Sequence, residues 1–298
     1  MAITIFSELQ TAVENWIGDT KFTARTNEFI AMAEDRIGLE LRCRAMEARL
    51  QMPLRAVIAG GTSTGSANAL TLSPGTSIAT LLLGHRFSFT ANATNTGGTT
   101  ATVDSASAAT VRKYIDGATA ALEANDIING LAYEMVYDGT YLLLCPTGGV
   151  PLPSRFQAVR ALFLDTNPVR FPEYLPPADF AVKNLRSSAG LPRFYTIEGD
   201  FLIFGPPPDV LYGVWLLYYR KFASLSAAGD TNWLLTNARG LLLYGALIES
   251  APFLGNDPRL MTWSTLFDSI MERIQTSDES DRFGSGPLVI RHDIQEPS

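Results

Sequence analysis

The sequence predicts an α+β protein in which a helical bundle core with β-hairpins is interrupted by an inserted all-β domain and followed by an extended C-terminal tail. Three observations support this fold class: charged residues become scarce in the middle of the chain, apolar residues recur every three or four positions on both flanks, and the last residues are polar. We therefore expect a discontinuous core of residues 1–57 and 150–275, an inserted β domain of residues 58–149, and a tail of residues 276–298.

The N-terminal flank reads as two helices and a strand. Apolar residues recur at helical spacing over residues 7–18 and 26–44, and residues 47–55 alternate between polar and apolar. Pro53 cannot donate a hydrogen bond to a strand partner, so this strand belongs at a sheet edge. A matching strand is expected at residues 156–164, and if the two strands pair as a hairpin, the insert is the enlarged tip of that hairpin.

The insert is expected to be all-β. It is rich in Ala, Gly, Ser and Thr, and residues 58–148 hold only nine charged side chains. Residues 86–90 alternate as a half-buried strand does. The β-rich runs 133–137 and 140–144 flank an Asp-Gly pair that favours a tight turn, which predicts a hairpin.

The elements after the insert follow from the same patterns. In order, we expect a helix at 176–185, a hairpin of strands 194–197 and 201–204, a strand at 210–220, a helix at 238–253, and a helix at 258–275. The helix at 238–253 is apolar nearly all round, which predicts burial on every side.

Composition limits the classes of function. The longest uncharged apolar runs have eight or nine residues, short of the roughly 18 that a membrane span needs, so we expect none. The net charge of −7 lacks the basic footprint of a nucleic-acid-binding protein. Cys43 and Cys145 form neither a disulfide framework nor a zinc pattern and are expected to be reduced, buried thiols.

No residues point to catalysis, a cofactor or a metal. His85 and His292 are the only histidines, and neither has a nucleophile and an orienting acid at a recognisable spacing. Residues 60–65 have the glycine spacing of a phosphate loop, but Ser66 stands where that loop needs lysine. We therefore expect a protein that is not an enzyme and holds no cofactor or metal.

Arginine supplies 19 of the 23 cationic residues, a bias typical of protein interfaces. Several cluster in the N-terminal flank among acidic residues: Arg25, Arg36, Arg42, Arg44 and Arg49. Two interpretations remain open, because these arginines could pair within their own helix or with a neighbouring subunit.

Several segments occur in an order that resembles a known family. They are residues 151–162, 173–180, 190–196, 218–221, 232–235, 244–254 and the Asp257-x-Arg259 motif. Together they resemble the head–tail adaptor, or connector, proteins of short-tailed, podovirus-type phages, over about 1–57 and 150–275. Within the insert, residues 68–72, 84–89 and 130–140 resemble small β modules of phage tail fibres.

The resemblance implies a structural virion protein. Such adaptors form a ring, usually of twelve copies, between the portal protein and the tail nozzle or tail tube. They complete the head after genome packaging and form part of the DNA ejection channel, where double-stranded DNA passes without sequence-specific binding. It implies a place in the neck of the virion after assembly in the host cytoplasm.

The same resemblance implies roles for individual residues. In the tail, Leu288, Val289 and Ile290 would contact the portal. Contacts between subunits would come from residues of the last two helices: Leu241, Leu247, Leu260, Trp263, Phe267 and Ile270.

The insert would project as a docking surface for fibres or the nozzle, through Phe87, Phe89, Tyr137 and Tyr141. The alternative function is a tail-fibre or nozzle attachment component that binds a receptor through the insert. A hydrolase acting on surface glycan would rest on carboxylates alone.

Overall fold

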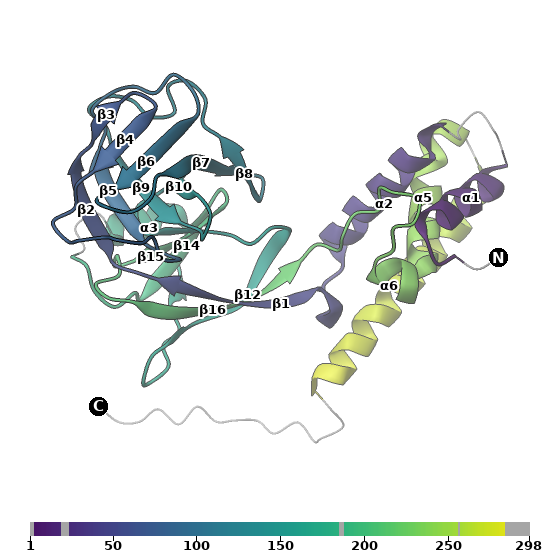
Figure 1. Ribbon diagram of the computed structural model, residues 1–298. Helices are drawn as coiled ribbons and strands as arrows, with labels where there is room; N and C mark the ends of the chain where they lie inside the picture. Colours follow the sequence, from purple (N-terminus) through teal and green to yellow (C-terminus); the bar gives the residue numbers. More distant parts are fainter. Residues whose placement is uncertain (1–2, 19–23, 185–187, 256, 284–298) are drawn as a thin grey trace, which may run out of the picture. The chain divides into compact units, whose positions relative to one another are not determined.

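The computed structural model describes residues 3–18, 24–184, 188–255 and 257–283 (Figure 1). The chain forms two compact units, residues 1–47 with 221–298 and residues 48–220. Helices dominate the first and β-sheets the second, so the predicted α+β class is confirmed.

Helix α5 is the centre of the helical unit. It packs against α1, α2, α4 and α6. The helical elements of this unit are α1 (Phe6–Ile17), α2 (Thr26–Glu40), the 3₁₀ turn η2 (Arg44–Met46), α4 (Trp233–Asn237), α5 (Arg239–Leu254) and α6 (Leu260–Phe283). The apolar surface of α5 faces partners on several sides, which explains why it needs no polar face.

Gly245 lets α5 approach its neighbours closely. A Cβ atom at this position would lie 3.0 Å from the Cβ of Ala33 on α2 and 3.3 Å from the ring of Phe267 on α6. Small residues at a helix crossing shorten the distance between the two axes. Phe267, the large side chain at this crossing, is itself buried.

Helix α6 is longer than the sequence pattern indicates. We expected residues 276–283 to begin an extended tail, whereas they continue the helix to Phe283. Two contacts to the end of α2 and to η2 support this extension: the backbone N–H of Arg44 donates to Asp278 Oδ1 at 2.6 Å, and Gln275 Nε2 donates to the carbonyl of Glu40 at 3.4 Å. These residues are mostly polar and show no helical spacing of apolar residues, so the sequence does not reveal a helix that contacts with distant segments stabilise.

The described residues of the β unit form three sheets and one helix, α3 (Pro177–Asn184). A nine-stranded sheet is formed by β2 (Val57–Thr62), β3 (Thr64–Ser66), β4 (Ala69–Leu72), β5 (Arg86–Thr90), β6 (Thr99–Val103), β7 (Ala109–Ile115), β8 (Ala118–Ala121), β9 (Ala132–Tyr137) and β10 (Leu142–Cys145). A four-stranded sheet is formed by β11 (Gly149–Pro151), β13 (Glu173–Tyr174), β14 (Phe194–Glu198) and β15 (Phe201–Gly205).

The third sheet corrects the predicted pairing of the strands that flank the insert. Its order is β1 (Glu47–Leu54), β16 (Tyr212–Arg220), β12 (Phe156–Asp165), so β16 separates the two strands expected to form a hairpin. Strand β16 buries Val214, Leu216 and Tyr218 on the face that β1 and β12 also bury. Alternation identifies the buried face of a strand, but it does not select the neighbour. Strand β1 does lie at the sheet edge, where Pro53 is tolerated.

The nine-stranded sheet covers residues 57–145, close to the expected insert, and has its own apolar core. It belongs to the same compact unit as the two smaller sheets. In this unit Arg86 of β5 donates a hydrogen bond to the carbonyl of Gly149, at the start of β11. An independent inserted domain at residues 58–149 stays a prediction.

Candidate assembly interface

The predicted intersubunit residues fall into two groups. Leu241, Leu247, Trp263 and Phe267 are buried among the helices of their own unit, where they form its core. Leu260 and Ile270 on α6 are half-buried. A fully buried side chain offers no area to a second copy, so an intersubunit role stays a prediction for the two half-buried residues.

Other apolar residues of the helices are exposed. On α2, Leu39 is 76% exposed and Met32 is 46% exposed; on α6, Met261 is 77% exposed. Met32 and Leu39 are seven residues apart and therefore lie on one face of α2. Sequence reasoning missed them, because it searched for the apolar stripe facing the core and these residues lie outside that stripe.

The N-terminal arginines contact other elements of their own chain. Arg36 forms an ion pair with Glu249 on α5, Nη2 to Oε1 at 2.6 Å. The guanidinium of Arg25 lies 5.0 Å from the ring centre of Phe253. For Arg36 and Arg25 the partner belongs to a different helix of the same subunit, whereas Arg42 donates to the carbonyls of Gly38 and Leu41 at the end of α2. Pairing with a neighbouring subunit stays a prediction.

A groove in the helical unit is bordered by η2, α4 and the last turns of α6. It has a volume of about 590 Å³, and we call it the α6 groove. Apolar lining comes from Cys43, Ala45, Trp233, Ala238, Ile270 and Ile274, and polar lining from Arg44, Asn237, Arg273, Ser277 and Asp278. On α6, Ile270, Arg273 and Ile274 lie within the predicted helix, whereas Ser277 and Asp278 lie on the extension that the sequence did not predict.

Glu34 on α2 holds the segment that leads from the β unit into α4. Its carboxylate accepts hydrogen bonds from the backbone N–H of Leu225, at 3.3 Å to each oxygen, and from Asn232 Nδ2 at 3.2 Å. Burial raises the pKa of Glu34 from its ordinary value of 4.5 to about 7. This carboxyl is therefore a pH-sensitive contact of the helical unit.

The predicted docking residues of the β unit are also divided. Phe87 and Phe89 are buried in the core of the nine-stranded sheet, whereas Tyr137 and Tyr141 are half-buried. The guanidinium of Arg112 lies 4.3 Å from the ring centre of Tyr141. A docking role stays a prediction for the two tyrosines, while both phenylalanines serve the core.

A row of stacked side chains crosses one face of the three-stranded sheet. The guanidinium of Arg49 on β1 lies 3.8 Å from the ring centre of Trp215 on β16. Trp215 stacks on Phe163 of β12, and Phe163 contacts Phe171, which is 72% exposed. Tryptophan, phenylalanine and arginine are frequent at protein interfaces. The row needs three strands to come together, so no local sequence pattern reveals it.

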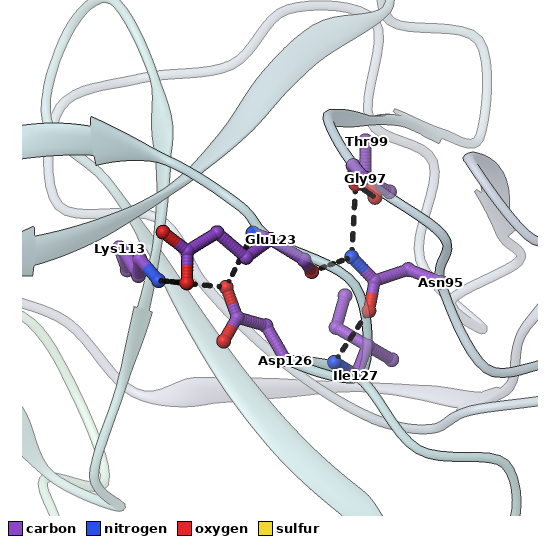
Figure 2. A network of polar contacts seen from close by, with 7 residues as sticks. All are labelled: Asn95, Gly97, Thr99, Lys113, Glu123, Asp126 and Ile127. Carbon is purple, nitrogen blue, oxygen red and sulfur yellow. Dashed lines mark hydrogen bonds and ion pairs between the residues drawn. The ribbon is translucent and has the colours of Figure 1, made fainter.

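A polar network in the β unit joins two loops and has the character of a structural support (Figure 2). The amide of Asn95 donates to the carbonyls of Gly97 and Glu123 and accepts from the N–H of Ile127 at 2.8 Å. Lys113 Nζ lies 3.2 Å from Glu123 and 3.1 Å from Asp126, so the nearby carboxylates face a cation.

The histidines and cysteines are the remaining residues that could support catalysis or metal binding. Burial lowers the pKa of His85 and raises the pKa of the Cys145 thiol to about 12. Among the described residues, no group of three or more His, Cys, Asp or Glu side chains could hold a metal ion. Neither cysteine is in a disulfide; Cys43 is buried, as expected, whereas Cys145 is half-buried by its exposed surface. His292 and the predicted portal contact at 288–290 lie outside the described residues.

No helix within the described ranges is long and apolar enough to cross a membrane.

Comparison with curated proteins found no match. The family model described as SU10 adaptor protein matches residues 4–291, which is nearly the whole chain. The chain therefore belongs to this family of phage structural adaptor proteins, whose place is the neck of the virion.

Proposed function

We propose that this member of the SU10 adaptor family forms a ring, of twelve copies, between the portal and the tail of a short-tailed phage. The ring completes the head after genome packaging and forms part of the channel through which DNA is ejected. No bond is made or broken, because the function is to bury surface between subunits and partners. The family match over residues 4–291 is the observation that carries this proposal.

The exposed side chains of the helical unit support contact between copies. Leu39 and Met261 expose about three quarters of their surface to solvent. Burying an aliphatic side chain of this size stabilises an interface by about 1.5–3 kcal/mol. Neighbouring copies in a ring present the same two surfaces repeatedly, so a modest gain at each contact is multiplied around the circle.

For the β unit we propose docking of fibres or nozzle proteins. The stacked row of Arg49, Trp215, Phe163 and Phe171 supports such a role, because large aromatic and arginine side chains dominate binding energy at interfaces. We keep the likeness of the insert to tail-fibre modules as part of this proposal.

The test is the size of the assembly formed by the purified full chain with and without portal protein, measured by light scattering and electron microscopy. A ring bound to the portal is the expected result. A chain that stays monomeric with portal present at micromolar concentration would overturn the proposal.

A receptor-binding component is the competing function, and substitutions on the β unit separate the two. For an adaptor, Tyr141→Ser in the insert should leave the ring intact and weaken only the docking of tail components. Loss of host-cell binding by this variant, with no portal-bound ring from the unaltered chain, would favour the receptor-binding function instead.

A further inference from the structure

The α6 groove lies close to where the described part of the chain ends. Its floor contains half-buried apolar side chains, among them Trp233, Ile270 and Ile274, and its α6 wall reaches Asp278. Helix α6 ends at Phe283, about 8 Å along the helix beyond Asp278 at a rise of 1.5 Å per residue, and residues 284–298 follow in the sequence. This segment contains the apolar island Leu288, Val289 and Ile290.

We propose that the α6 groove binds residues 288–290 of the same chain before the protein assembles. An apolar groove open to water is stabilised when an apolar segment covers it, by about 25 cal/mol for each Å² buried. The island is the apolar part of a segment that otherwise consists mostly of polar and small residues. Docking would remove both apolar surfaces from water at once.

The length of the connecting chain allows this docking. From Phe283 to Leu288 the backbone can span up to about 17 Å, whereas Ile274 lies about 14 Å back along α6. The chain must reverse direction beyond the helix. Gly284 and Gly286 permit that reversal, because glycine adopts positive φ angles at little cost.

The charges of the groove and of the segment are complementary. Arg273 on α6 and Arg44 on η2 are exposed residues of the groove lining. Asp278 also lines the groove, so two arginines and one carboxylate leave its lining with one net positive charge. After the island, Arg291 is outnumbered by Asp293 and Glu296, so the segment carries one net negative charge. Arginine at an exposed rim favours carboxylates mainly by steering and orienting them, with a small energy for each pair.

The docked segment would keep the portal-binding island covered until the portal competes for it. This consequence rests on the proposed function, whereas the docking itself concerns the isolated chain and can be tested without portal protein. A short tether gives the segment an effective concentration on the order of 1 mM. An intrinsic Kd of about 100 µM would therefore keep the groove roughly 90% occupied.

The test uses the full chain and a fluorescent peptide of residues 284–298 as the probe. A tail variant with Leu288→Asp, Val289→Asp and Ile290→Asp should vacate the groove and bind the peptide. The unaltered chain should bind the peptide about tenfold more weakly, because its own segment competes. Fluorescence anisotropy measures both affinities.

Groove variants made in the tail variant identify the binding site. Ile274→Glu should abolish peptide binding, and Leu266→Glu, on α6 but outside the groove, is the matched control that should preserve it. Circular dichroism checks that both remain folded. Arg273→Glu, at an exposed position, should weaken binding threefold or more if Ile274→Glu unfolds the chain.

Three results would overturn the proposal. They are binding of the peptide to neither chain, equal affinity of the peptide for the tail variant and the unaltered chain, and oligomers that the unaltered chain forms and the tail variant lacks. The last result would place the segment in the groove of a second copy. Ring formation with portal protein is scored separately, so failure of the docking leaves the proposed function standing.

Discussion

Arg86 and Glu134 form an ion pair in the interior of the β unit, with Nη2 and Oε1 2.8 Å apart and both side chains almost fully buried. Arg86 also donates to the carbonyl of Gly149, and Glu134 accepts from the N–H of Gly148 at 3.3 Å. Burial raises the pKa of Glu134, and the charge of Arg86 opposes that rise. The pair joins β5 and β9 to the start of β11.

Breaking this pair should be costly. Arg86→Met should lower the free energy of unfolding by about 3–5 kcal/mol, because Glu134 would remain buried without a compensating charge. The double variant Arg86→Met with Glu134→Leu should lose less than the single variant, since it removes both charges. Urea unfolding compares the two. Equal losses would show that the ion pair is not what the single variant disrupts.

The titration of Glu34 should make the free energy of unfolding depend on pH. Its folded-state pKa of about 7 lies above the ordinary value of 4.5, so the folded chain keeps a proton that the unfolded chain has lost between these values. The free energy of unfolding should therefore fall as the pH rises from about 4.5 to about 7, by roughly 1 kcal/mol after discounting for partial exposure.

Glu34→Gln should remove this part of the pH dependence, because an amide does not titrate. Glu28→Gln changes an exposed carboxylate on the same helix and is the matched control. Thermal unfolding at several pH values measures both. A slope in Glu34→Gln equal to that of the unaltered chain would contradict the assignment.

The close contact between α5 and its neighbours should tolerate no added bulk. Gly245→Val should destabilise the helical unit by about 1–3 kcal/mol, because its side chain would collide with Ala33 and Phe267. Gly38→Ala on α2 meets no atom within 4 Å and should stabilise the helix by about 0.5–1 kcal/mol. Opposite signs in the two melting temperatures are the expected outcome.

In the Asn95 network, the buried amide of Asn95 should contribute more to stability than the surface ion pairs of Lys113. Asn95→Ala should lower the free energy of unfolding by about 1–3 kcal/mol, because the buried N–H of Ile127 loses its acceptor and the carbonyls of Gly97 and Glu123 lose a donor. Lys113→Met in the same network should change it much less, since Lys113 makes solvent-accessible ion pairs with Glu123 and Asp126. Similar effects of the two variants would argue against this division.

Exposed apolar residues of the helices should matter for assembly and not for folding. Leu39→Glu and Met261→Glu should change the free energy of unfolding by less than about 0.5 kcal/mol, because both side chains are mostly in solvent. Each should reduce ring formation with portal protein. Val182→Glu, at an equally exposed position in the β unit, is the control that should leave the ring intact. Normal rings from the helix variants would remove these residues from the interface.

Local patterns in the sequence were sufficient to determine the α+β class and the positions of most elements. Helix α5 is recognisable because its apolar residues continue around the whole helix, and β5 because its side chains alternate. These patterns depend only on neighbours along the chain, so they can be recognised before the fold is known. The order of the segments likewise indicates the adaptor family, because that order is a property of the chain alone.

Contacts between distant segments were decided by the tertiary structure alone. Strand β16 separates β1 from β12, α6 continues to Phe283 with support from Arg44, and Trp215 meets Arg49 and Phe163 across three strands. The apolar patterns in the sequence are compatible with several pairings of strands and helices that would bury a similar apolar surface. Shape and hydrogen-bond partners select one of them, and these become defined only when the chain packs.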